Sequence, residues 1–148
     1  MVAGLVVQPF QSLPEDVGPL LRVSRGEGHD LVERLVDDWE DGSNRFDRPG
    51  EVALEALLGS RLVGVGGLNQ DPYLDDPTVG RIRHVYVSPD ARGLGVGRVL
   101  VMTLVERARG RFSRVRLRAG PAGASGFYLR LGFEETPDEP DATHQLVF

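Results

Sequence analysis

A glycine-rich stretch, Arg-Gly-Leu-Gly-Val-Gly at residues 92–97, carries the strongest chemical signal in the chain. It directly follows a predicted strand over residues 82–87 and opens a predicted helix over residues 96–109. Glycines let the backbone approach a ligand closely, and the first turn of a helix offers unpaired N–H groups and the positive end of the helix dipole. Together these features predict a cradle for a diphosphate, to which Arg92 and Arg98 could add charge-assisted hydrogen bonds.

The glycines have two alternative explanations. A dinucleotide-binding turn of the pattern G-x-G-x-x-G requires a glycine where this chain has Arg98 or Leu100, and an acidic residue at the end of the next strand, about 20 residues on. The strand predicted at residues 113–117 has no acidic residue, so this alternative is excluded. The other alternative is a glycine-rich turn that serves tight packing alone, and it stays open.

The residues around the loop resemble a known family. The segment Tyr-Val-Ser-Pro-Asp-Ala-Arg-Gly-Leu-Gly-Val-Gly at residues 86–97 is similar to the central motif of the GNAT superfamily of N-acetyltransferases. The segment Ala-Ser-Gly-Phe-Tyr-Leu-Arg-Leu-Gly-Phe at residues 124–133 is similar to that family's next motif. The resemblance implies a single α/β (α+β) domain over residues 1–148. Its central sheet would be mixed and mostly antiparallel, with one parallel, splayed strand pair and flanking helices.

The resemblance also implies an activity: transfer of the acetyl group of acetyl-CoA to an amine that attacks the thioester directly, without a metal. In the family, the strand before the loop bonds the pantetheine arm through its backbone, and main-chain groups of the loop hold the diphosphate. The matching positions, with Arg98 added for its charge, are Val85, Tyr86, Val87, Arg92, Gly93, Leu94, Gly95, Val96, Gly97 and Arg98. Tyr128 matches the family's usual proton donor, and a phenol with a reference pKa of about 10 is protonated at neutral pH.

Two positions depart from the family pattern and leave the general base open. Many relatives have a glutamate at the start of the fourth strand, where this chain has Arg81. Many also have an asparagine seven residues before the tyrosine, where this chain has Pro121. His84 and His144 remain as titratable candidates, and we expect His84 to be the catalytic one.

His84 also has a structural explanation. Strict alternation along the predicted strand puts it on one face with Ile82 and Tyr86, where a histidine can equally belong to the core or be held by hydrogen bonds. The same alternative applies to His144 in the last predicted strand, and a chain of water molecules could replace a protein base. Three isolated histidines without close pairing give no case for a metal site.

The elements predicted around these motifs form an α/β pattern with a mixed sheet. A strand, a helix and a strand in succession imply a right-handed crossover between parallel neighbours. The expected strands are residues 3–8, 52–58, 61–68, 82–87, 115–119, 133–134 and 143–148. The expected helices begin at capping-box spacings after Ser12 and Asp30 and cover residues 96–109 and 124–131. Pro19 predicts a broken or short first helix.

Composition restricts the function classes. The 148 residues fit one domain, and the sequence contains neither cysteine nor lysine, which excludes disulfides, thiolate zinc sites, Walker loops and Schiff-base chemistry. A net charge of -5 argues against nucleic-acid binding, but residues 81–118 hold ten arginines against two acids, which favours a small anionic ligand. With no membrane-spanning run and no secretory signal, we expect a cytoplasmic protein, with a homodimer as one possible assembly.

The acceptor is the least determined part of the hypothesis. Acidic residues before the binding strand (Asp71, Asp75 and Asp76, with Tyr73) and at the end of the second helix (Asp37, Asp38, Glu40 and Asp41) suggest a cationic amine, a small molecule or a peptide. The alternative is that these charges are only solvated. Two other functions stay open: a non-catalytic acyl-CoA-binding sensor or interaction module, and transfer to a hydroxyl group or of a longer acyl chain.

Overall fold

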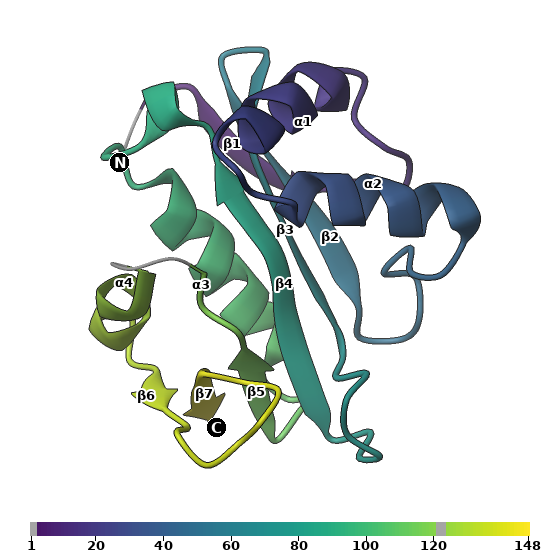
Figure 1. Cartoon of the computed structure of the whole chain (residues 1–148), viewed down its shortest axis with the longest axis vertical. Helices are drawn as coiled ribbons and strands as arrows, with labels where there is room; N and C mark the ends of the chain where they lie inside the picture. Colours follow the sequence, from purple (N-terminus) through teal and green to yellow (C-terminus); the bar gives the residue numbers. More distant parts are fainter. Residues whose placement is uncertain (1–2, 121–123) are drawn as a thin grey trace.

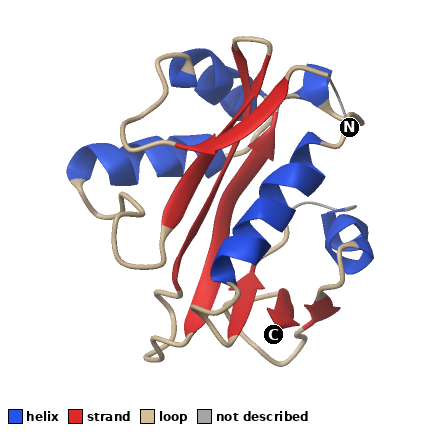
Figure 2. Ribbon diagram, turned by 180° about the vertical axis from the view of Figure 1, so that it is seen from behind, coloured by secondary structure: helices blue, strands red, loops and turns tan. Residues whose placement is uncertain are grey.

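Residues 3–120 and 124–148, which the computed structural model describes, form a seven-stranded sheet with helices on both faces (Figures 1 and 2). The strands are β1 (Leu5–Pro9), β2 (Val52–Leu58), β3 (Arg61–Gln70), β4 (Val79–Val87), β5 (Arg114–Leu117), β6 (Glu134–Glu135) and β7 (His144–Val147). The helices are α1 (Val17–Gly26), α2 (Leu31–Asp41), α3 (Val96–Ala108) and α4 (Ala124–Arg130), with a short 3-10 turn at Pro89–Ala91.

The sheet is mixed, as expected. Its order is β1-β2-β3-β4-β5-β7-β6, and the described strands pair antiparallel except for β4 and β5, which are parallel. Helix α3 connects these two strands, which is the predicted crossover. Every helix in the described part of the chain is too short or too polar to span a lipid bilayer.

Helices α1 and α2 cover one face of the sheet, and α3 covers the other (Figure 1). The inner side of α2 consists of Val32, Leu35 and Trp39, which follow one another at helical spacing. Helix α3 is buried on most of its circumference and packs Leu100 and Leu104 against the strands. The hydrophobic core is therefore divided into two layers by the sheet itself.

The first helix differs from the prediction. It begins at Val17, with Asp16 as its N-cap, rather than after Ser12, and no side chain caps it. Pro19 does not break it, because a proline within the first turn lacks only an N–H group that would have no partner inside the helix. For α2 the predicted N-cap Asp30 is correct in position, although its carboxylate instead pairs with Arg34.

Strand β4 contains a β-bulge at His84. Tyr86 pairs with Val65 of β3 and Arg83 pairs with Gly67, so two residues of β4 lie opposite a single residue of β3. His84 has a φ of 60°, in the left-handed region that histidine adopts more readily than most residues. The expected shared face for Ile82 and Tyr86 is wrong: the extra residue reverses the alternation, and the two side chains belong to opposite core layers.

Beyond the bulge, β4 separates from β5. The parallel pairing starts at Val79 and Arg114 and ends at Arg81 and Arg116, although β4 continues to Val87. A bulge bends its strand and increases the local twist, which directs the second half of β4 away from its neighbour. The expected parallel pair is therefore present, its pairing covers only the first part of β4, and the bulge lies just beyond the point where this pairing ends.

A buried ion cluster fixes the paired end of these strands. The Asp71 carboxylate, which is fully buried, accepts hydrogen bonds from Arg116 Nε at 2.9 Å and Arg81 Nη1 at 3.3 Å. Burial alone would raise the pKa of the Asp71 carboxyl, but the bonds from Arg116 and the Tyr73 amide and the charge of Arg81 hold that pKa below its usual value. Arg81, which occupies the position of the family's glutamate, is therefore part of a structural ion cluster in this protein. Its Nη2 also donates to the carbonyl of Asp141 at 2.7 Å.

We expect Asp71→Asn to destabilise the protein strongly. The substitution removes the counter-charge of buried Arg81 and leaves buried Arg116 with Glu139 as its remaining acidic partner, 3.5 Å from its Nη1. Removing one partner of a buried ion cluster costs about 3 kcal/mol or more. In a chain of this size that corresponds to a fall in Tm of roughly 6–12 °C, measured by thermal unfolding. Asp75→Asn, an exposed change on the same loop, is the control and should leave Tm within about 1 °C. Equal melting temperatures for both variants would contradict a structural role for this cluster.

Candidate functional site

Two cavities meet where β4 and β5 part. The first has a volume of about 340 Å³ and lies between the middle of β4 and the chain that follows β5. The second has a volume of about 700 Å³ and lies between the end of β4, the glycine-rich loop, the start of α3 and α4. Leu31, Val85, Gly120 and Tyr128 line both cavities, so the splay joins them into one continuous site.

The glycine-rich loop borders the second cavity, and its backbone amides are without partners in the described residues. Gly93 and Gly95 have φ values of 80° and 85°, a conformation that other residues adopt only with strain. Within the described residues, the amides of residues 93–98 donate no hydrogen bond, and neither an acidic residue nor a capping side chain occupies the first turn of α3. The loop therefore presents a row of free donors at the positive end of the helix dipole.

Gly97 lines the second cavity and lies beside Phe127 and Val87. A Cβ atom at Gly97 would lie 3.4 Å from Phe127 and 3.7 Å from Val87, whereas Cβ atoms at Gly93 and Gly95 would meet nothing within 4 Å. The sequence-predicted binding residues of β4, the loop and α3 thus lie together around one cavity. Leu94 is the exception, because it does not line that cavity and its side chain is exposed.

The guanidinium of Arg92 pairs with Glu27, a residue that sequence reasoning missed. Arg92 donates to both Glu27 oxygens, at 2.9 Å and 2.6 Å, and the Tyr86 hydroxyl donates to the same carboxylate. The hydrogen bonds from Arg92 and then from Tyr86 hold the pKa of Glu27 below its usual value. Arg98, in contrast, is exposed and makes no ion pair or hydrogen bond with the described residues.

Tyr128 lies at the junction of the two cavities. Its ring packs edge-on against Phe127 and Phe133, with centroids 5.0 Å and 5.5 Å away, which fixes the side chain from both sides. Burial raises the pKa of the Tyr128 hydroxyl to about 12. The phenol is therefore protonated throughout the physiological range, as the sequence predicts for a proton donor.

His84 borders the first cavity, and its imidazole is kept neutral. The side chain is 94% buried, its Nε2 has no hydrogen-bond partner in the described residues, and its ring packs edge-on against Phe46. Burial, followed by the charges of Arg83 and Arg34, lowers the pKa of His84 to about 3. A hydrogen-bonded role for His84 is therefore not observed, and the side chain is available for chemistry only as a neutral imidazole.

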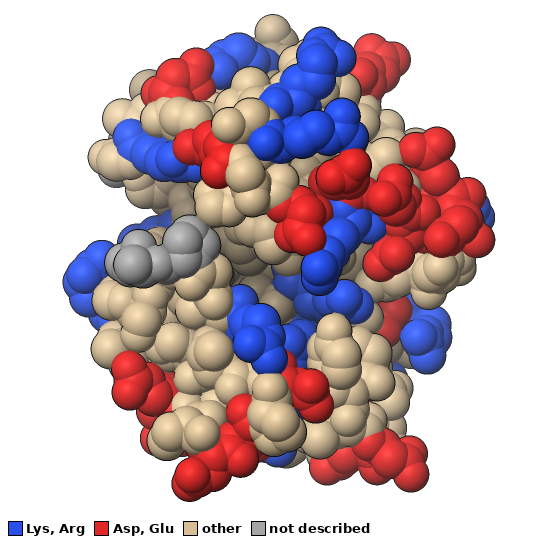
Figure 3. Space-filling view, viewed as in Figure 1, with Lys and Arg blue, Asp and Glu red and all other residues tan. Residues whose placement is uncertain are grey.

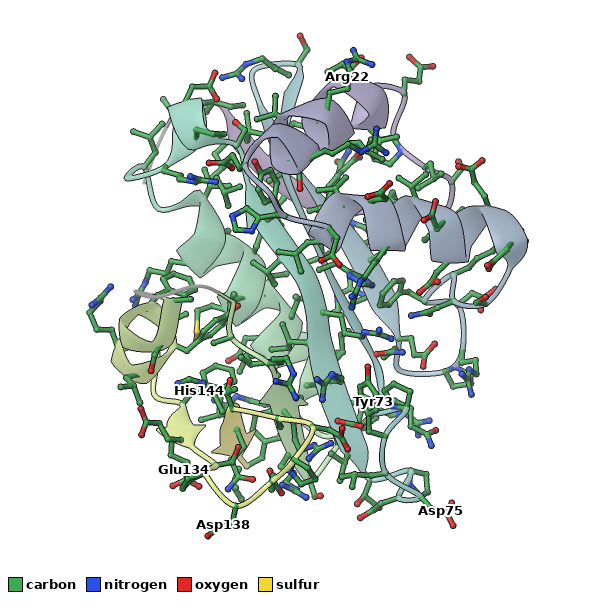
Figure 4. The ribbon with its side chains drawn as sticks, in the orientation of Figure 1. Arg22, Tyr73, Asp75, Glu134, Asp138 and His144 are labelled. Atoms are coloured by element: carbon green, nitrogen blue, oxygen red, sulfur yellow. The ribbon has the colours of Figure 1, made fainter. Side chains whose placement is uncertain are left out.

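The other base candidates lie outside the two joined cavities or have other partners. His144 Nε2 and Nδ1 lie 2.9 Å and 2.8 Å from the hydroxyls of Ser125 and Thr143, and the residue borders a third cavity on the β7 side (Figure 4). Pro121, the position of the family's asparagine, lies outside the described residues. No group of three or more histidine, aspartate or glutamate side chains in the described ranges is placed to hold a metal ion.

The acidic residues expected to select a cationic acceptor do not line the first cavity. Asp71 is buried in its ion cluster, Asp76 accepts hydrogen bonds from Thr78, and Asp75 points away at the outer tip of the loop (Figure 4). Figure 3 shows acidic side chains gathered over the outer end of α2 and basic ones in the central hollow. Of the acids in the described chain, Asp30 alone borders this cavity, so the charge argument for a cationic acceptor is not supported.

Comparison with known proteins identifies related sequences and folds. A model of the acetyltransferase (GNAT) family matches residues 18–133. A mycothiol acetyltransferase from Rhodococcus jostii is 33% identical over 109 residues, which cover 71% of this chain and 34% of the relative, so the match spans about a third of that relative's length. The crystal structure of a proposed acetyltransferase from Exiguobacterium sp. 255-15 has a TM-score of 0.85 and 30% identity, and the match covers 97% of this chain and 93% of the other. A GNAT family N-acetyltransferase from Escherichia coli in complex with CoA has a TM-score of 0.69 and 20% identity, and the match covers 99% and 83% of the two chains.

The low pKa of His84 predicts a specific pH dependence of stability. The unfolded chain takes up a proton at His84 as the pH falls below 6.5, but the folded chain does so only near pH 3. The neutral His84 therefore has no cost to the free energy of unfolding above pH 6.5. Below that pH, the free energy of unfolding decreases by up to about 1.4 kcal/mol per pH unit as the pH falls toward 3. A titration of the His84 ring by NMR should give a pKa near 3, and His84→Asn, which tolerates the same φ, should show a shallower loss of stability in acid. A pKa near 6.5 would contradict the buried, arginine-flanked environment.

Proposed function

Because the chain belongs to the acetyltransferase (GNAT) family, we propose that it transfers the acetyl group of acetyl-CoA to the nitrogen of an amine, a small molecule or the end of a peptide. The observation that carries the proposal is the row of amides at residues 93–98, which have no partner in the described part of the chain and lie beside a gap in the sheet. Free amides at a helix N-terminus suit a diphosphate, and the gap beside β4 suits the extended arm attached to it. The coenzyme in the related Escherichia coli structure is CoA, which agrees with this choice of donor.

The second half of β4 is proposed to hold the pantetheine arm as a neighbouring strand would. Beyond Arg81 this edge of β4 has no partner strand among the described residues, so its peptide groups can pair with an extended ligand. The carbonyl of Val87 also accepts a bond from Arg92 Nε at 3.1 Å, which links the end of the strand to the loop. This arrangement would lead the thioester toward Tyr128, at the entrance to the first cavity.

The chemistry proposed for the junction requires no enzyme nucleophile. Acetyl-CoA supplies an activated acyl group, whose thioester carbonyl a neutral amine can attack. Tyr128 donates a hydrogen bond to the departing sulfur, and with its pKa of about 12 it stays protonated while doing so. His84 is the proposed proton acceptor: the attacking nitrogen becomes more acidic as its bond to carbon forms, so a neutral imidazole can take the proton at that stage even though its resting pKa is low.

A non-catalytic acyl-CoA sensor is the second candidate. Arg81 occupies the position of the family's glutamate and is held in a buried cluster, and Glu27 pairs with the loop residue Arg92. A CoA-release assay over amines of different charge, run beside acetyl-CoA binding by calorimetry, separates the two functions. Turnover of at least one amine supports the enzyme. Saturable binding with no turnover of any amine, hydroxyl acceptor or longer acyl-CoA would support the sensor.

Replacement of Tyr128 by phenylalanine removes the hydroxyl and keeps the ring packing. We expect kcat to fall at least about tenfold, because the departing thiolate loses its hydrogen-bond donor, while the Kd for acetyl-CoA stays within about twofold. Steady-state kinetics and calorimetry measure the two quantities. If kcat is unchanged, Tyr128 has no part in the reaction.

Gly97→Glu tests the diphosphate cradle, with Gly97→Ala as its matched control. The glutamate places a carboxylate in the first turn of α3, where it stabilises the helix but competes with the diphosphate for the same amides. We expect the Kd for CoA to rise about a hundredfold or more, and the alanine variant to show a much smaller change because its Cβ only touches Phe127. Wild-type affinity in a folded Gly97→Glu protein would refute the assignment of the loop.

A further inference from the structure

The first cavity, on the acceptor side of the proposed reaction, is lined by four arginines and one acid. These residues are Arg34, Arg81, Arg83, Arg118 and Asp30. A small enclosed space with this surplus of positive charge attracts anions and repels cations, and the effect is stronger than on an open surface because less water screens it. The charge of the lining therefore favours a ligand with a negatively charged group.

The four arginines differ in how many ion pairs and hydrogen bonds they make with the rest of the protein. Arg81 pairs with buried Asp71 and donates to the Asp141 carbonyl. Arg118 donates to the Pro140 carbonyl at 2.8 Å, and Arg34 pairs with Asp30 at 2.8 Å on the rim, where both side chains are more than half exposed.

Arg83 is different. It is half-buried and makes no ion pair or hydrogen bond within residues 3–120 and 124–148. It precedes the bulge directly, on the strand that borders both cavities. A guanidinium without a protein partner beside a cavity keeps its N–H donors and its charge available, and this suits a negatively charged group on a ligand.

A second observation points to a ligand at the same place. His84, the next residue, is 94% buried and lines the cavity, and its Nε2 has no partner in the described part of the chain. Buried polar atoms are almost always satisfied, so an orphaned ring nitrogen next to an unpaired guanidinium is consistent with a site whose polar groups are completed by a bound molecule.

We propose that the acceptor is an amine that also carries a carboxylate, an amino acid or a compound of that type, and that Arg83 binds the carboxylate while Arg34 closes the rim over it. The guanidinium plane can hold a carboxylate through two parallel hydrogen bonds, which would fix the direction of the amine as well as its charge. One guanidinium suits one carboxylate, and a cavity of about 340 Å³ suits a small molecule. This inference rests on the proposed function and specifies its acceptor.

The first test compares acceptors in matched pairs. Each common L-amino acid is assayed against its own α-carboxamide, which keeps the amine and the side chain and removes the charge, with cadaverine and spermidine as cationic amines. We expect kcat/KM for the best acid to exceed that for its carboxamide by about tenfold or more. Amidation makes the amine less basic, which by itself favours the carboxamide, so such a preference cannot come from amine basicity. A carboxamide or polyamine as the best acceptor would overturn the inference and leave the acetyltransferase proposal intact.

The second test uses Arg83→Gln, with Arg22→Gln as control. Arg22 lies on the outer surface of α1, remote from both cavities (Figure 4). We expect Arg83→Gln to lower kcat/KM for the acid about 10–100-fold, mainly by raising KM. The kcat/KM for the carboxamide should change less than about twofold. An equal loss for both acceptors would indicate a structural role for Arg83 and would overturn the inference.

A third measurement requires no turnover. At neutral pH, where the probe carboxylates are ionised, saturating N-acetyl-L-amino acids should shift the NMR signals of the Arg83 guanidinium and the His84 ring, and the matching N-acetyl carboxamides should not. Absence of this shift with every probe would refute the anion site. If the shift occurs but no amine is ever acetylated, the proposed enzyme fails and the anion-binding cavity stands, so the two failures are distinguishable.

Discussion

Strand β4 pairs in parallel with β5 only as far as Arg81, and at His84 it contains one residue more than β3 can pair with. The bulge bends the strand just after the pairing with β5 ends at Arg81. Everything that makes the site follows from that divergence. It opens the sheet between the two cavities and exposes a free backbone edge over the last residues of β4. Tyr128 lines both cavities at the point where they join. The proposed donor and acceptor would therefore meet at a gap that the backbone creates.

The charges around this gap divide into those that stabilise the fold and those that are free to bind. Asp71 pairs with both Arg81 and Arg116 inside the paired part of the strands, and Arg116 also pairs with Glu139, so the arginine at the family's glutamate position acts as part of the scaffold. Arg83, two residues later on the same strand, has no such partner in the described residues and faces the acceptor cavity. Within β4, Arg81 has an acidic partner and Arg83 has none among the described residues. The site is therefore locally basic, although the protein as a whole has a net charge of -5.

Most of the fold and the donor half of the site could be predicted from the sequence, because both depend on local signals. The glycines before α3, the tyrosine at position 128 and the strand-helix-strand pattern each occupy a short segment. The acceptor half could not be predicted in this way. The bulge at His84 reverses the alternation on which face assignments depend, and Asp71 is an exposed loop acid by sequence but a buried counter-ion in the fold. On the side of the second cavity, the pair of Glu27 and Arg92 was missed because the two residues lie 65 positions apart. The cytoplasmic location and the homodimer stay predictions.

The central claim is that the amides before and within the first turn of α3 hold the diphosphate of CoA beside the opened sheet. Hydrogen exchange of those amides, measured with and without saturating CoA, tests it most directly. In the free protein residues 93–98 should exchange rapidly, since they have no partner among the described residues. With CoA bound, the same amides should slow by about tenfold or more, together with those at the end of β4. Unchanged exchange throughout the loop under saturating CoA would contradict the account.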